Sequence, residues 1–176
     1  MSFSIVSDPV TIFQEKLGSL FTDAVMQFQE YRGELTLTVR PERIIELCQA
    51  LREHPDLRFD LLSDLTAVDH LQDRKAGDPR YHVVYHLFST HTKKRIRLKA
   101  PVDGETPEID SVTPVWRGAD WHERECYDMF GIVFRGHPDL RRILMPEDWV
   151  GYPLRKDYPV TGEETYDYIN KQLADE

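Results

Sequence analysis

The sequence predicts an α+β fold: a single domain with a mixed or antiparallel sheet packed by helices, followed by an extended C-terminal tail. The chain of 176 residues fits one domain, and a hydrophobic content of 40% is enough for an ordinary core. Helical and strand-like patterns follow in the order α-β-β-α-β-β-β-α, which is typical of α+β layers. We assign residues 1–136 to the domain and 137–176 to the tail, where a long helix is excluded by Pro138, Pro146, Pro153 and Pro159.

An amphipathic helix is predicted near the N-terminus. Asp8 and Pro9 resemble an N-cap and a first helical position, and apolar residues then recur at helical spacing as far as Leu20. Residues 24–30 and 34–39 flank a short turn, and the second of them alternates as a half-buried strand does. These two segments therefore predict a β-hairpin.

A second helix and two strands are predicted next. The helix begins at Pro41, ends at His54-Pro55, and carries its apolar residues on one stripe, which makes Cys48 a core residue. Residues 57–68 predict a strand, bulged or regular. Residues 81–88 are β-branched and aromatic on both faces, which indicates a central strand.

A further strand carries a basic row. After the polar loop 73–79 and the central strand, Arg95, Arg97 and Lys99 alternate with apolar residues. This pattern predicts the second strand of another hairpin, with one solvated face. The basic row is most simply an edge that discourages aggregation, and a docking site for an acidic partner is the alternative.

The densest cluster of functional side chains lies on a helix predicted at 119–130 and ending at Gly131. His122 and Cys126 share one face, but the segment does not match H-E-x-x-H, and two ligands fall short of a zinc site. Locally we predict an i,i+4 ion pair between Arg124 and Asp128. The side chains expected to pack inward are Trp121, Cys126, Met129 and Phe130.

Composition excludes several classes of protein. The formal net charge of −9 argues against a general binder of nucleic acid or anionic lipid. No apolar run approaches the roughly 20 residues that span a bilayer, and the N-terminus lacks signal-peptide features. Cys48 and Cys126 are too few for an iron-sulfur cluster, which usually needs four thiolates. His82 and His86 share a strand face and could meet at a metal, although such histidines are more often surface or hydrogen-bonded core residues.

The tail has the composition of an interface. Aromatic residues and arginines, which are enriched in interface cores, alternate with aliphatic residues between Pro138 and Val160. A proline-stiffened segment also loses less entropy when it binds. A tail that wraps a neighbouring subunit explains this composition, and the alternative is a tail that folds back over its own domain.

A long run of residues here resembles a known family. The run begins Glu123-Arg124-Glu125-Cys126-Tyr127-Asp128-Met129-Phe130-Gly131-Ile132 and continues through Gly136-His137-Pro138 and Leu140-Arg141-Arg142-Ile143-Leu144. It extends through Met145-Pro146-Glu147-Asp148-Trp149 and Gly151-Tyr152-Pro153-Leu154-Arg155-Lys156-Asp157-Tyr158. Between Trp116 and Pro159 the sequence is similar to the 30 kDa subunit family of respiratory complex I.

The resemblance implies a non-catalytic subunit in the peripheral arm of a proton-translocating NADH:quinone oxidoreductase. It implies docking on the large quinone-site subunit beside iron-sulfur subunits, on the cytoplasmic side of the bacterial inner membrane. No cofactor is expected in this chain, because NADH, FMN, the iron-sulfur clusters and quinone would belong to partner subunits. The expected interface residues are Glu123, Arg124, Glu125, Asp128, His137, Arg141, Arg142, Trp149, Tyr152, Leu154, Arg155 and Tyr158.

Two other functions stay open on the sequence alone. A ferredoxin-linked or hydrogenase-linked relative of complex I would share these motifs, so the electron donor is not fixed. A stand-alone enzyme with a metal held by His122, Glu123 and Cys126 is the second alternative.

Overall fold

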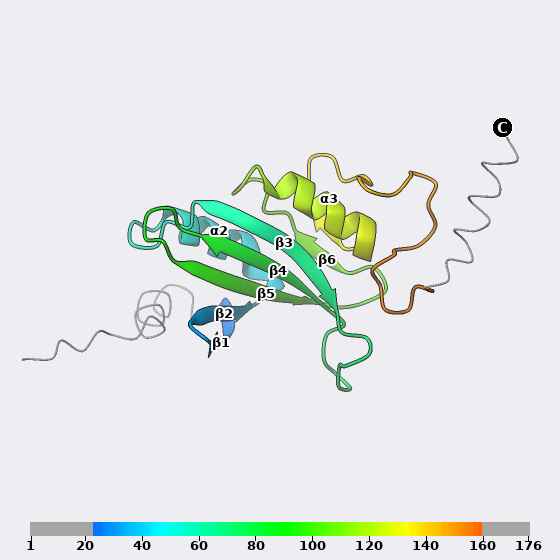
Figure 1. Ribbon diagram of the computed structural model, residues 1–176, viewed down its shortest axis with the longest axis horizontal. Coiled ribbons are helices and arrows are strands. Elements are labelled where there is room, and N and C mark those ends of the chain that lie inside the picture. Colours follow the sequence, from blue (N-terminus) through cyan, green and yellow to red (C-terminus); the bar gives the residue numbers. More distant parts are fainter. Residues whose placement is uncertain (1–22, 160–176) are drawn as a thin grey trace, which may run out of the picture.

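The structure, a computed structural model, describes residues 23–159 and contains a five-stranded mixed sheet in the order β1-β2-β5-β4-β3 (Figure 1). The predicted helix at 8–20 and the end of the tail lie outside the described residues. Strands β1 (Val25–Tyr31) and β2 (Glu34–Val39) form the predicted hairpin. Their turn contains Arg32 and Gly33 with φ of 53° and 78°, a left-handed pair that suits a tight two-residue hairpin.

Strands β3 (Leu61–Asp69), β4 (Tyr81–Phe88) and β5 (Arg95–Val102) form an antiparallel meander. The register of β3 shifts between Leu62 and Asp64, so the strand is bulged. Strand β2 then pairs in parallel with β5, which makes the sheet mixed. The strand predicted to start at 57 instead starts at 61, because the preceding residues form turns that bury Phe59.

One face of the sheet is covered and the other is open within residues 23–159. After the short 3-10 helix η1 (Pro41–Arg43), helix α2 (Ile44–Glu53) buries one apolar stripe, Ile44, Leu47, Cys48 and Leu51. Helix α3 (Ala119–Phe130) lies along β3 (Figure 1). Both helices share a single core with the inward residues of the strands, and Cys48 is confirmed as a core residue.

A second, two-stranded sheet was not predicted. Strands β6 (Glu108–Asp110) and β7 (Val133–Arg135) pair in parallel, and α3 lies in the crossover that connects them. Each strand has only three residues, too few for alternation to stand out in a sequence. This unit places α3 against the main sheet, and the α+β single-domain prediction is confirmed.

Candidate partner interface

Helix α3 turns one side to the core and one side outward. Its core side has helical spacing and comprises Ala119, Glu123, Cys126 and Phe130. The predicted inward packing of Cys126, Met129 and Phe130 is confirmed, but that of Trp121 is wrong, since its side chain is 62% exposed. Trp121 follows Ala119 by two residues, about 200° around the helix, and so lies on the opposite side.

Asp128 is fully buried and holds the start of the C-terminal segment, residues 137–159. One carboxylate oxygen accepts the N–H groups of Ile143, Leu144 and Met145 at 3.0, 2.7 and 2.8 Å. The other accepts Nη1 of Arg142 at 2.6 Å. Burial raises the pKa of Asp128, but these donors outweigh it and hold the pKa below its ordinary value.

The predicted ion pair between Arg124 and Asp128 is therefore wrong, because Asp128 pairs with Arg142 instead. Arg124 lies over the ring of Trp121 and donates to the carbonyl oxygens of residues 141 and 142, each at 3.2 Å. Arg124 and Asp128 thus both bind the C-terminal segment, Arg124 through backbone carbonyl groups and Asp128 through backbone N–H groups and Arg142.

Arg142 connects α3 to the loop that follows. Its guanidinium donates to Asp128 and, through Nη2, to the carbonyl oxygens of Trp149 and Gly151, both at 3.0 Å. With 14% of its side chain exposed, it makes these contacts inside its own chain. The turn from 142 to 151 is fixed around this one cation.

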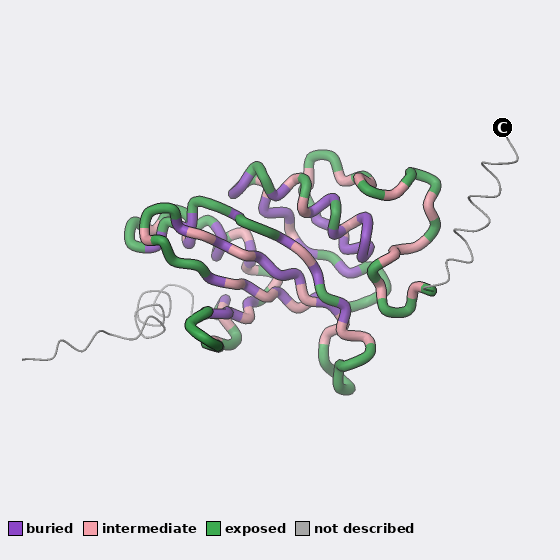
Figure 2. Tube along the Cα trace, viewed as in Figure 1, coloured by how far each residue is buried: buried purple, intermediate pink, exposed green. Residues whose placement is uncertain are grey.

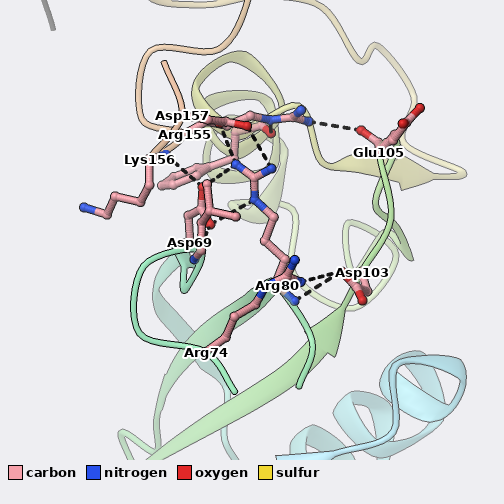
Figure 3. A network of polar contacts seen from close by, with 10 residues as sticks. Asp69, Arg74, Arg80, Asp103, Glu105, Arg155, Lys156 and Asp157 are labelled. Atoms are coloured by element: carbon pink, nitrogen blue, oxygen red, sulfur yellow. Dashed lines mark hydrogen bonds and ion pairs between the residues drawn. The ribbon is translucent and has the colours of Figure 1, made fainter. Parts of the chain in front are cut away.

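A second buried carboxylate, Asp69 at the end of β3, holds the far part of the segment (Figure 3). It accepts the N–H of Lys156 at 2.8 Å and two bonds from Arg80 at 3.0 and 2.8 Å. Arg80 also donates to both carboxylate oxygens of Asp157. Burial raises the pKa of Asp69, but Arg80 and two backbone N–H groups more than offset it and lower the pKa.

Between these two anchors, Arg155 and Tyr152 close over the C-terminal end of α3. The Nε of Arg155 donates to the carbonyl oxygen of Phe130 at 2.6 Å, and its guanidinium lies 4.5 Å from the Tyr152 ring centroid. Gly131 has φ of 72°, and a Cβ there would meet the Tyr152 ring at 2.5 Å. Only glycine lets the ring approach this closely.

Glu123 lies in the core, away from any surface. One oxygen accepts the N–H of Val112 at 2.7 Å, and the other has no hydrogen-bond partner within residues 23–159. Burial raises the pKa of Glu123 to about 7, although the Ser111 hydroxyl, which is close but bonded to Thr113, and the Val112 N–H both lower it. Burial thus favours the neutral form of this carboxyl.

Comparison with known proteins identifies the family of the chain. Residues 37–164 match the family described as the 30 kDa subunit of respiratory-chain NADH dehydrogenase. The chain belongs to this family. A relative in Citrifermentans bemidjiense, itself a subunit of NADH-quinone oxidoreductase, is 53% identical over 153 residues, 87% of this chain and 91% of that protein. Its counterpart in Roseiflexus sp. strain RS-1 is 51% identical over 150 residues, 85% of this chain and 84% of that protein.

Solved structures of two other proteins share the fold of this 30 kDa family member. A trypsin-resistant fragment (1–134) of Nqo5 has a TM-score of 0.61 and 29% identity, covering 73% of this chain and 98% of the fragment. A chain of the membrane-bound sulfane sulfur reductase, an archaeal respiratory membrane complex, has a TM-score of 0.62. At 20% identity over 90% of this chain and 89% of that one, it shows the fold alone.

The twelve residues predicted for the interface divide between interior and surface. Glu123, Arg124 and Asp128 are buried, whereas Glu125, Arg141 and Leu154 are exposed. The remaining six are partly buried, namely His137, Arg142, Trp149, Tyr152, Arg155 and Tyr158. Most of the predicted charged residues therefore hold the segment to its own domain, and their contact with a partner stays a prediction.

The surface of this region carries four exposed apolar side chains, of which the predicted set contained Leu154 but omitted Trp121, Leu144 and Val150. Figure 2 shows the C-terminal segment as mostly exposed or intermediate. Trp121 on α3 and Leu144, Val150 and Leu154 on the segment are 50–63% exposed. Sequence reasoning also missed Asp69, Arg80 and Asp157. The segment's apolar composition was a signal for the first group, whereas nothing local links Asp69 to residues 156–157.

A metal site formed by His122, Glu123 and Cys126 is the alternative prediction for α3. Residues 23–159 contain no group of three or more His, Cys, Asp or Glu side chains placed to hold a metal. His122 lies 3.6 Å from Asp64, and the Cys126 thiol donates to the carbonyl oxygen of Leu65. In the same described range, no helix is both long and apolar enough to cross a membrane.

Proposed function

We propose that this 30 kDa family member is a non-catalytic subunit in the peripheral arm of an NADH:quinone oxidoreductase. It docks on the large quinone-site subunit through the outer side of α3 and residues 137–159, called here the docking surface. By fixing the geometry of that partner it supports electron transfer to quinone, because such chemistry is sensitive to small displacements.

The observation that carries this proposal is a set of exposed apolar side chains on a segment that hydrogen bonds hold against its own domain. Trp121, Leu144, Val150 and Leu154 remain 50–63% exposed, although Asp128 and two arginines hold the segment beneath them. Exposed apolar residues gathered in one region mark interaction sites. Because these hydrogen bonds restrain the segment, less conformational entropy is lost on docking, which favours tight association.

The chain's own side chains suit a supporting role. The two thiols, Cys48 and Cys126, are both buried, and burial raises the pKa of each, which disfavours the thiolate that binds iron. We therefore assign NADH, FMN, iron-sulfur clusters and quinone to partner subunits, and no activity to the isolated chain. Its place at the cytoplasmic side of the membrane would come through these partners.

Co-purification from native membranes tests the proposal. N-terminally tagged full-length chain is isolated after gentle solubilisation, and its companions are identified by mass spectrometry. Leu144→Asp and Val150→Asp should lose the large quinone-site and iron-sulfur subunits, while unfolding of the free chain changes by no more than about 0.5 kcal/mol, as for most surface substitutions. Tyr31→Asp, at a 65% exposed residue on β1, is the matched control and should keep the companions.

Either of two results would overturn the proposal. The unaltered chain could emerge without companions, in which case it belongs to no assembly. Retention of every companion by both aspartate variants would show that docking uses another surface. When the companions are present, their identity also distinguishes an NADH-fed complex from a ferredoxin-fed or hydrogenase-linked one.

A further inference from the structure

The open face of the sheet lies away from α3 and concentrates positive charge in its centre. Arg95, Arg97 and Lys99 project from β5 on this face, since the residues between them are buried. The register places His86 beside Arg97 on the neighbouring strand β4. Within residues 23–159, no helix covers this face, so these basic side chains reach the surface. They form a local basic surface on a chain whose net charge is −9.

This surface is hollowed where four strands meet. A pocket of about 260 Å³ is lined by Glu34, Ser63, His86, Arg95 and Arg97, together with the intervening residues of β2, β4 and β5. Ser63 lies within the bulge of β3, where the regular pairing with β4 is interrupted. The volume of the pocket falls below the roughly 300–1,000 Å³ of ordinary small-molecule sites and suits one or two side chains.

The cations of this face are only partly neutralised. Arg97 donates to Glu34 at 2.9 Å and to the Thr36 hydroxyl at 3.3 Å. Arg95 lies 5.3 Å from the Phe88 ring centroid and, like Lys99, forms no ion pair with any residue in the described range. Burial and Arg97 lower the pKa of His86, while Asp64 and Glu34 raise it. Near His86, the three cations Arg95, Arg97 and Lys99 are therefore accompanied by only two carboxylates, Glu34 and Asp64.

We propose that this basic face binds an acidic segment of a neighbouring subunit, with a carboxylate of that segment entering the pocket beside Arg95. The inference rests on the proposed function for its setting, but it concerns a surface distinct from the docking surface. A short acidic segment fits because the positive charge is confined to one strand. An extended polyanion such as nucleic acid would meet the repulsion of the whole chain's net charge of −9.

Apolar neighbours also favour a polypeptide. Val68 is 40% exposed on β3 and pairs in register with His82, and Leu61 is 46% exposed opposite Phe88. Aliphatic and aromatic contacts beside the cations match a segment that mixes acidic and apolar residues. Desolvation of Arg95 and Lys99 by such a segment would strengthen the charge contacts and fix the register of docking.

Lysine reactivity reports on this face directly. The intact complex and the free full-length chain are acetylated with the same N-hydroxysuccinimide ester, and each lysine is quantified by mass spectrometry. Lys99 should react at least about tenfold more slowly in the complex, because interface cores exclude water. Lys75, in the exposed loop before β4, should change little and is the control. In a separate sample of the intact complex that has not been acetylated, a carbodiimide should link Lys99 to an Asp or Glu of another subunit.

Charge reversal supplies the second measurement. Lys99→Glu should weaken retention of the acidic subunit as salt is raised, whereas Lys94→Glu in the exposed β4–β5 turn should not. Equal reactivity of Lys99 in an intact complex and in the free chain would overturn this inference alone. Slow reaction in both would show that the chain covers its own face and would equally overturn it. Failure to form any complex would refute the proposed function as well.

Discussion

Replacement of Glu123 by Gln should make the chain more stable at alkaline pH and leave it little changed at acidic pH. The carboxyl is buried, with one oxygen bonded to Val112 and the other unpartnered in the described range. Its pKa rises from an ordinary value of 4.5 to about 7, mainly through burial. Gln keeps the shape and the acceptor for the Val112 N–H but never carries a charge.

The magnitude follows from the two pKa values. Between pH 4.5 and 7 the unfolded chain loses its Glu123 proton first, so the unfolded state binds fewer protons and stability falls as pH rises. A tenfold change in proton affinity is worth about 1.4 kcal/mol, so the rise to about 7 corresponds to a loss of roughly 3 kcal/mol. The loss is complete above the folded pKa and absent below the unfolded one.

Urea unfolding of the isolated full-length chain at pH 4, 6 and 8 measures this effect. The difference in unfolding free energy between Glu123→Gln and the unaltered chain should grow by about 3 kcal/mol from pH 4 to pH 8. All other titrating groups are shared by the two proteins and cancel. Glu125→Gln, at an exposed neighbour on α3, should show no such growth. Parallel stability profiles for Glu123→Gln and the parent would refute the reasoning.

Two further changes probe the anchors of the C-terminal segment. Asp128→Asn should destabilise the chain by about 3–5 kcal/mol, because it leaves the buried guanidinium of Arg142 without its carboxylate partner. Trypsin should then cut after the arginines that are released. Asp139→Asn, at an exposed residue of the same segment, is the control. Since the pKa of Asp128 is lowered, its contribution should also be lost as pH falls below 3.8, which acid unfolding would show. Gly131→Ala should cost more than Gly136→Ala, since both have positive φ but only the former meets the Tyr152 ring, and equal melting temperatures would contradict this.

Periodicity located the strands but not their neighbours. The alternation from Arg95 to Ala100 correctly identified the buried side of β5, because a strand with one solvated face must alternate. The same pattern contains no information on which strand lies next to it. The parallel pairing of Thr36 with Arg97 joins segments 61 residues apart, and only the closure of the whole core determines it.

Helical spacing likewise predicted a contact that tertiary structure replaced. An i,i+4 pair such as Arg124 with Asp128 is worth only about 0.2–0.5 kcal/mol on an isolated helix. Once residues 142–145 cover that side of α3, three N–H groups and Arg142 become available to Asp128. A buried carboxylate requires this many donors, so the remote contacts prevail. The family resemblance could be recognised without this geometry, because the run of residues that begins at Glu123 is similar to the family in sequence alone.

The parallel pairing of β2 with β5 also sets an order for folding during synthesis. A two-stranded hairpin such as β1–β2 is marginal by itself in water. Its stable neighbour, β5, leaves the ribosome about 60 residues later, or roughly 3–12 s at typical rates of translation. During that interval the inner edge of β2 is unpaired, and an unpaired strand edge is prone to pairing with other chains until Val102 emerges.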